Sequence, residues 1–509
     1  MNMKKILTIL ILAVIFTNCT KLEIAPNSQL TDQTSYKSKS EFLNGLAGVY
    51  STLGTWSEVV YKIGGSTDEM IFPARGADWK GDLQPLFAHT WLPTNGEIGG
   101  IYSGLSRIIA VSNTFIDVVD ASSFKTDSLI KVEKGEVRFI RAFAYFLMLD
   151  HFGNVPLVTS SVYDPNILPK QNTRAELFQF VESETKDLIG SVLPAKNSYG
   201  RVDKYAAETL LAKLYLNAGV YLGTANTHLA DVVTQTTDIM TKSSYHLDPD
   251  FKHVFAWNND VNNVENIFTM VADSKNTAAV NISYLFSITD LTDKYGPFAS
   301  GWDGAATLPT FYRSFEPKDN RSAMWIAGPQ VGADGKPILA VDDQNVKRQL
   351  DYVADFKASD PVNNADHWDG VRGGKYLMDG IGGTMVTSSL NNDMPIFRFA
   401  DVIMMRAEAL YRQNAGSAEA LTLVNQVRNR GGNPVAPFTS LTDANFLAER
   451  GREFAWEGWR RNDLIRFGKY NDPWDYKTAS GEDFRNLFPI PATQIQSNPN
   501  LKQNPVYQP

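Results

Sequence analysis

The stretch KYAAETLLAKLYLNAGVYL, residues 204–222, decides the fold because its side chains sort into two rows at helical spacing. The rows are Ala206, Leu210, Leu214 and Ala218, and beside them Ala207, Leu211, Tyr215 and Gly219. Residues four apart lie on one face of an α-helix. Because each row mixes small residues with large ones, a second helix can approach closely. The pattern therefore predicts a helix that packs against another helix along its length.

A partner for this helix and two further pairs of helical segments are expected from the same kind of pattern. The segment RAELFQFVESETKDLIGSVL, from Arg174, is the expected partner, and the two resemble a tetratricopeptide-type helix pair. An earlier pair is expected at 98–119 and 132–151, and a later one at FADVIMMRAEALYR from Phe399 and SAEALTLVNQVRNR from Ser417. The aromatics expected in the core, from their apolar helical stripes, are Phe139, Phe143 and Phe399. The pairs keep no strict period, so the predicted fold class is mainly α, a degenerate α-α superhelix.

Helical periodicity fades between about residues 245 and 395, where Asn, Asp, Gly and aromatic residues take over. Residues 251–330 alone hold thirteen aromatics, which is too many for a disordered linker. We expect an ordered, loop-rich insertion on the helical scaffold. Long ordered loops commonly carry function.

Composition excludes several classes of protein and site. The 509 residues carry a formal net charge of -8, which argues against a general nucleic-acid binder. A single cysteine excludes a disulfide framework and a Cys-rich metal site. None of the six histidines forms a HExxH or HxH pattern, and the pair His246 and His253 is a weak metal candidate. No nucleophile elbow, Walker loop or dinucleotide fingerprint is present, but a pair of catalytic carboxylates stays an open alternative among 56 acids.

The lone cysteine, Cys19, follows directly on a secretory-type leader. Lys4 and Lys5 precede the apolar run from Ile6 to Phe16, which is shorter than the roughly 20 residues of a membrane-spanning helix. The placement predicts a signal peptide at 1–18, acylation of Cys19, and a polar tether over 19–38. The alternative is a chance cysteine after an ordinary signal.

The densest charge pattern is ERGREFAWEGWRRNDLIRFG, residues 449–468. Its acids Glu449, Glu453 and Glu457 are spaced as one face of a helix and need cations against them. Arg406 lies on an apolar stripe, so we expect it to be partly buried and paired with one of these glutamates. The alternative is a cluster of catalytic acids.

The lipobox-like cysteine, the helices FRFADVIMMRAEALYR and ERGREFAWEGWRRNDLIRFG, and the closing LFPIPATQIQSNPNLKQNP together resemble the SusD/RagB family of outer-membrane lipoproteins. The stretch RGADWKGDLQPLFAHTWLPTNGEIGGIYSGLSRI is also similar to that family. The resemblance implies a non-enzymatic protein without a cofactor. It implies helix pairs that pack on a SusC-like TonB-dependent transporter, and loop aromatics that bind oligo- or polysaccharide outside the cell. The expected SusD-like domain covers 39–509, with a helical scaffold at about 39–244 and 396–470 and the aromatic region at about 245–395.

Glycan binding needs exposed aromatic rings for stacking and polar neighbours for the sugar hydroxyls. Trp79 qualifies beside Arg75 and Asp78, and Trp302 qualifies within a glycine-containing turn. The remaining candidates are Tyr284 and Asn281, with Trp325 and Trp368 as weaker ones. No metal ligand is predicted. Two other functions stay open, a glycoside hydrolase and a helical-repeat adaptor that binds peptides or proteins.

Overall fold

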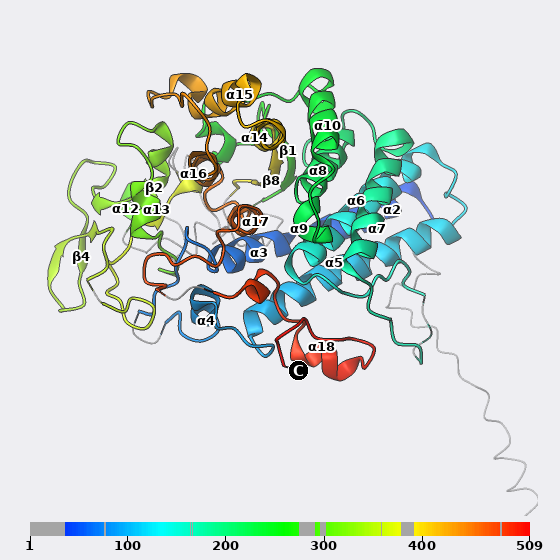
Figure 1. The fold of residues 1–509 in the computed structure, drawn as a ribbon, viewed down its shortest axis with the longest axis horizontal. Coiled ribbons are helices and arrows are strands. Elements are labelled where there is room, and N and C mark those ends of the chain that lie inside the picture. The colour runs from blue at the N-terminus through cyan, green and yellow to red at the C-terminus, as the bar shows by residue number, and fades with distance from the viewer. Residues whose placement is uncertain are drawn as a thin grey trace, which may run out of the picture.

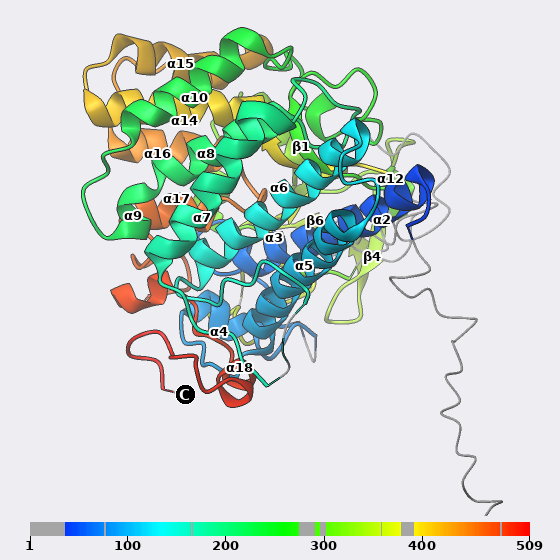
Figure 2. The ribbon, with the colours of Figure 1, turned by 90° about the vertical axis from the view of Figure 1, so that its right-hand side faces the viewer.

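The computed structural model describes residues 36–75, 78–162, 164, 166–273, 291–295, 302–357, 359–377, 391–478 and 481–508. Seven helices of the described chain form its scaffold (Figures 1 and 2). They are α5 (Gly96–Ala121), α6 (Ser128–His151), α7 (Arg174–Asp187), α8 (Lys204–Leu216), α10 (Leu229–Lys242), α14 (Phe399–Gln413) and α15 (Ala418–Arg428). Each contacts the next in this order, which is the arrangement of an α-α superhelix. The predicted fold class and helix pairs are confirmed.

Two predicted helices end earlier than their apolar patterns suggest. The stretch 204–222 divides into α8 and α9 (Ala218–Leu222) at Asn217, whose side-chain amide donates to the Lys213 carbonyl at 2.9 Å. That bond satisfies a carbonyl of the last turn and lets the chain bend. Likewise α7 stops at Asp187 and continues as a π-helical turn, η2 (Leu188–Val192).

The insertion leaves the superhelix after α10 and returns at α14, two helices that pack against each other. The described part of the insertion contains four antiparallel two-stranded pairs. They are β1 (Asn266–Met270) with β8 (Met394–Arg398), β2 (Trp325–Ile326) with β7 (Arg372–Gly373), β3 (Gly328–Pro329) with β6 (Asp351–Tyr352), and β4 (Leu339–Val341) with β5 (Lys347–Gln349). In Figure 1, β2 and β4 of the insertion lie at the left side of the molecule, whereas β1 and β8 lie in its middle, near α14 and α10.

The remaining elements of the described chain precede, interrupt and follow this series of helices. Before α5 lie α2 (Lys39–Ser51), η1 (Thr52–Gly54), α3 (Thr55–Gly64) and α4 (Leu83–Ala88). The insertion adds η3 (His253–Phe255), α12 (Thr292–Tyr295), α13 (Pro309–Arg313), η5 (Asn320–Met324) and η6 (Lys375–Leu377). After α15 come η7 (Arg430–Gly432), α16 (Asp443–Glu453), α17 (Arg460–Arg466), η8 (Asp483–Asn486) and α18 (Ala492–Ser497). Within these described ranges no helix combines the length and apolarity needed to cross a bilayer.

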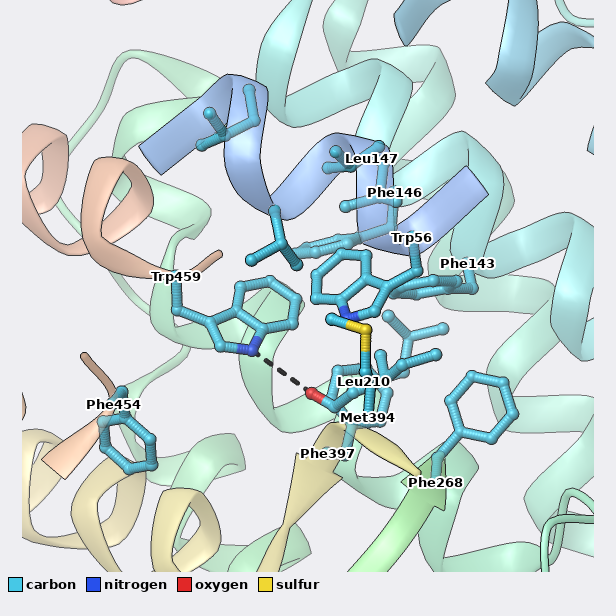
Figure 3. Close-up of a cluster of buried hydrophobic side chains, with 14 of the residues drawn as sticks. Trp56, Phe143, Phe146, Leu147, Leu210, Phe268, Met394, Phe397, Phe454 and Trp459 are labelled. Carbon is cyan, nitrogen blue, oxygen red and sulfur yellow. Dashed lines mark hydrogen bonds between the residues drawn. The ribbon is translucent and has the colours of Figure 1, made fainter. Parts of the chain in front are cut away.

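An aromatic cluster joins the superhelix to the insertion (Figure 3). Phe143 of α6 meets Phe268 of β1 edge to face, with ring centroids 5.9 Å apart, and Phe397 of β8 at 5.6 Å. Trp459 stacks on Phe397 and donates its indole N–H to the Ile396 carbonyl at 3.2 Å. The predicted core aromatics Phe139, Phe143 and Phe399 are all buried, as expected. Edge-to-face packing of this kind stabilises beyond simple area burial.

The N-terminus of α7 carries a capping box that supports a first test of local stability. The Thr173 hydroxyl accepts from the Glu176 N–H at 3.2 Å, and the Glu176 carboxylate accepts from the Thr173 N–H at 2.7 Å. We expect Thr173→Ala to lower the free energy of unfolding by about 0.5–2 kcal/mol in urea denaturation. Ser183→Ala, on the exposed face of the same helix, is the control, with a change within about 0.5 kcal/mol. Equal losses in both variants would contradict the capping role.

The predicted single helix at 449–468 is wrong. Helix α16 ends at Glu453, and α17 begins only at Arg460. Between them Trp456 and Gly458 adopt φ of 58° and 84°, in the left-handed region, so the helix cannot continue. Glu457 therefore does not lie in the helical row of Glu449 and Glu453, although all three carboxylates are buried.

Arg398, at the end of β8, pairs with both Glu453 and Glu457, whereas Glu449 pairs with Arg321, Arg428 and Arg452. The predicted pairing of Arg406 with this row is wrong. Arg398 contacts Glu453 at 2.7 Å, Glu457 at 2.8 Å and Glu265 at 2.8 Å. Arg406 instead pairs with Glu419 at 2.7 Å, because its side chain leaves the helix toward α10 and α15. Burial alone would raise the pKa of Glu453, but nearby guanidiniums, chiefly Arg430 and then Arg398, hold it well below its usual range. The cluster is thus a buried ion network, as the structural interpretation of the charge pattern predicted.

Candidate functional site

The structure brings together the two tryptophans that the sequence singled out. The Trp79 indole N–H donates to the Trp302 carbonyl at 3.0 Å. The ring centroids lie 6.5 Å apart, with planes inclined at 40°. Trp302 is 53% exposed and Trp79 is half-buried, so the pair offers an aromatic surface to solvent. We call Trp79 and Trp302 the indole pair.

One face of the Trp79 ring packs on the hydrophobic core. Its backbone adopts φ of 59°, in the left-handed region. Its ring lies against Phe72, which is buried, with centroids 5.4 Å apart, and Phe72 rests edge-on against Tyr61. A two-way backbone bridge between Ile71 and Ala306 joins the Trp79 loop to the Trp302 loop. The indole pair is therefore fixed by neighbours that are themselves anchored.

Arg75 holds the two loops together and does not face solvent. Its guanidinium is buried and donates to the carbonyls of Asp303 at 2.8 Å, Gly304 at 2.6 Å and Asp369 at 2.9 Å. Burial, followed by the charge of Arg372, lowers the pKa of Arg75 to about 9. Its donors are thus used within the protein, and the predicted ligand contact becomes a positioning role.

Asp78 sits where the sequence placed it, exposed beside the indole pair. Its backbone forms a bridge with Arg75, and the Asp78 N–H donates to the Arg75 carbonyl at 2.9 Å. The carboxylate faces water and can accept from a ligand hydroxyl. The predicted residues Tyr284 and Asn281 lie outside the described residues. Trp325 and Trp368, the weaker candidates, are buried and pack in the core.

Three further residues near the indole pair were not predicted as site residues from the sequence. They are Arg372, His367 and Asp343. Arg372 binds the Asp303 carboxylate at 2.8 Å, and His367 Nδ1 lies 3.1 Å from the same carboxylate. The backbone N–H of His367 donates to Asp343 at 2.9 Å. A signal was available, because the tripeptide Trp-Asp-Gly occurs twice, at 302–304 and 368–370. Backbone carbonyls of both copies accept hydrogen bonds from the Arg75 guanidinium.

The electrostatics of the site favour hydrogen-bond acceptance over acid catalysis. Burial would raise the pKa of Asp303, but Arg372 and Arg75, with His367, lower it below the ordinary value. Asp303 therefore stays ionised and cannot act as a proton donor near neutral pH. Among the residues that the structure describes, no group of three or more His, Cys, Asp or Glu side chains is placed to hold a metal ion. The arrangement suits a ligand with flat apolar faces and hydroxyl groups at its edges.

Comparison with known proteins covers nearly the whole chain. The SusD family matches residues 251–507, and a family described as starch-binding associating with outer membrane matches residues 33–216. The chain is 28% identical to the starch-binding protein SusD of Bacteroides thetaiotaomicron, over 91% of this chain and 86% of that protein. It is 24% identical to a SusD-like protein of Bacteroides ovatus, over 99% of this chain and 98% of that protein.

Solved structures show the same fold. A SusD homolog from Bacteroides thetaiotaomicron superposes with a TM-score of 0.74 at 20% identity, covering 94% of this chain and 98% of that chain. Surface glycan-binding protein A from the same organism, in complex with laminarihexaose, gives a TM-score of 0.70 at 18% identity, covering 92% and 99%. At such identities the likeness concerns the fold alone. Because the SusD model covers half of the sequence, and the second match extends over its N-terminal part, the chain belongs to the SusD family.

Proposed function

We propose that this protein binds oligo- or polysaccharide at the indole pair. The observation that carries the proposal is the placement of Trp79 and Trp302, residues 223 positions apart, as neighbouring inclined rings with an exposed face. A sugar ring that lies on an indole buries its C–H groups against the π system. The exposed carboxylate of Asp78, next to Trp79 in the chain, is an acceptor for sugar hydroxyls.

The relatives support a glycan as the ligand. The curated relative from Bacteroides thetaiotaomicron is a starch-binding protein, and two structural neighbours are a laminarihexaose complex and a laminarin-binding SusD-like protein. Starch and laminarin are both polymers of glucose that differ in linkage. Aromatic stacking reads the ring and not the linkage, so the indole pair is compatible with either class.

The cellular setting is part of the same proposal. Residues 1–18 act as a lipoprotein signal, acylated Cys19 anchors the chain to the outer membrane, and 19–38 form the tether. The domain from 39 to 509 faces the cell exterior and passes glycan to a SusC-like TonB-dependent transporter. The description of the N-terminal match, starch-binding associating with outer membrane, supports this location. The unique cysteine at the end of an apolar run supports the anchor.

One set of measurements on the full-length protein in detergent distinguishes a glycan-binding protein from a glycoside hydrolase. We expect calorimetry to detect binding of at least one member of a panel of malto-oligosaccharides and laminari-oligosaccharides. We expect no new reducing ends after prolonged incubation with starch or laminarin. New reducing ends would establish a glycoside hydrolase instead. A panel without any bound glycan, together with specific capture of peptides, would establish the adaptor.

A further inference from the structure

His367 lies between two loops that come from distant parts of the insertion. Its Nδ1 is 3.1 Å from Asp303 Oδ2, in the loop of Trp302. Its Nε2 is 3.7 Å from Asp343 Oδ1, in the turn between β4 and β5. Asp343 also receives the backbone N–H of His367 at 2.9 Å. One imidazole thus bridges the loop of the exposed tryptophan and the tip of a hairpin.

We propose that protonated His367 is a latch that fastens the Trp302 loop to the β4–β5 hairpin and thereby holds the indole pair ready for glycan. The inference rests on the glycan-binding function proposed above and adds a regulation of that same site by pH. His367 is a positioning residue, because it acts on Trp302 through the neighbouring Asp303.

The charge on the ring carries the argument. His367 Nδ1 lies at hydrogen-bonding distance from Asp303, whereas Nε2 lies 3.7 Å from Asp343, which is the distance of an ion pair and not of a hydrogen bond. Neutral imidazole can donate only to Asp303, whereas the positive imidazolium is attracted to both carboxylates at once.

Other charged groups surround the ring. Arg75 opposes protonation of His367, and Arg372 donates to the His367 carbonyl at 2.6 Å while it neutralises part of Asp303. Lys357 pairs with Asp366 at 3.4 Å, next to the histidine in the chain. The hydrogen bond to Asp303 nevertheless raises the pKa of His367 above its ordinary value of 6.5, against the opposing effect of partial burial.

The raised pKa of His367 decides at which pH the latch is closed. A group whose pKa is raised in the folded protein contributes fully below its unfolded pKa and loses that contribution as pH rises through the raised value. The latch is therefore closed below pH 6.5 and opens at higher pH. Asp303 stays ionised throughout, because the adjacent guanidiniums lower its pKa. Neutral glycans bring no titrating group of their own.

The test compares glycan affinity at about pH 5.5 and about pH 8.5, on either side of the ordinary histidine value. For the full-length protein in detergent with the best-bound neutral oligosaccharide, we expect a fall of about three- to tenfold on raising the pH. His367→Gln should bind weakly at both values, without this pH dependence. Asp343→Asn should lose part of the dependence while keeping an acceptor for the His367 backbone N–H. His246→Gln, an exposed histidine outside the site, is the matched control and should behave as wild type.

A second readout needs no ligand. The fluorescence difference between wild type and Trp302→Phe reports the surroundings of this one indole, and we expect it to titrate with pH in wild type but not in the His367→Gln background. Glycan binding that ignores pH, or a pH dependence that survives His367→Gln, overturns the latch and leaves the proposed function intact. Absence of glycan binding together with a His367-dependent fluorescence titration overturns the proposed function and leaves the latch intact. Absence of both signals overturns both.

Discussion

Replacement of Arg398 by methionine is expected to lower the free energy of unfolding by about 3–5 kcal/mol, the cost of breaking a buried ion network on one side. The variant leaves the carboxylates of Glu265, Glu453 and Glu457 without their common partner, and all three are buried. Methionine is similar in length to the arginine stem, so the packing loss is small. Arg430, Arg321 and Lys375 still contact these acids, but the buried network loses one positive charge and the hydrogen bonds of one guanidinium. Guanidinium or thermal denaturation followed by circular dichroism measures the change.

The control for this variant is Arg406→Met, in the helix that follows directly. Arg406 pairs with Glu419, whose side chain is 51% exposed, so water replaces the lost partner. We expect a loss below about 1 kcal/mol. Similar losses for both arginines would show that the network around Arg398 is not the special element of this fold.

The Arg398 variant should also respond differently to acid. Guanidiniums hold the pKa of Glu453 below its ordinary value of 4.5, against the raising effect of burial. The stability contributed by this carboxylate is therefore present above pH 4.5 and is lost as pH falls through the lowered value. Without Arg398 the pKa of Glu453 rises, so the acid unfolding midpoint should move to higher pH.

Replacement of Trp302 or Trp79 by alanine is expected to weaken glycan binding by about 1–3 kcal/mol each, the scale of one lost aromatic platform. That is a fall in affinity of roughly 5- to 150-fold, measured by calorimetry with the best-bound oligosaccharide. Trp302 is the more exposed ring, whereas Trp79 both offers a face and donates to the Trp302 carbonyl. We therefore expect the double variant to lose less than the sum of the two single losses.

Two further variants sharpen this test. Trp79→Phe keeps an aromatic face but removes the N–H donor, so it separates stacking from the hold on the Trp302 loop. Trp257→Ala removes a partly exposed indole, 38% accessible, elsewhere in the insertion, and should leave the affinity unchanged. Unchanged affinity in both Trp79→Ala and Trp302→Ala would place the glycan elsewhere on the protein.

The helices were predictable because their signal is local. A residue's neighbours at three and four positions decide which face it occupies, and the stripes through Phe143 and through Leu210 place these residues in the core. The breaks at Asn217 and Trp456 were not predictable in the same way. A side-chain bond to a carbonyl and a left-handed backbone angle override a continuous apolar pattern.

The partners of buried charges were less accessible to sequence reasoning. The spacing of the acids in residues 449–468 predicted that Glu453 pairs with a cation. The spacing does not say which of the arginines in the chain is that cation. Arg398 reaches Glu453 because β8 runs past the end of α16, whereas Arg406, two turns into α14, points toward Glu419. Such a choice depends on how elements pack and not on their spacing along the chain.

The sequence by itself determined the helical superhelix, its aromatic insertion and the two candidate tryptophans, because periodicity, composition and glycine-containing turns are properties of short segments. Only the tertiary structure decided that Trp79 and Trp302 are neighbours, that Arg75 is buried beneath them, and that His367 bridges Asp303 and Asp343. These contacts join loops far apart in the chain, and no local pattern specifies them. They depend on how the segment between α3 and α4, which carries Arg75 and Trp79, packs against the insertion, which carries Trp302 and His367.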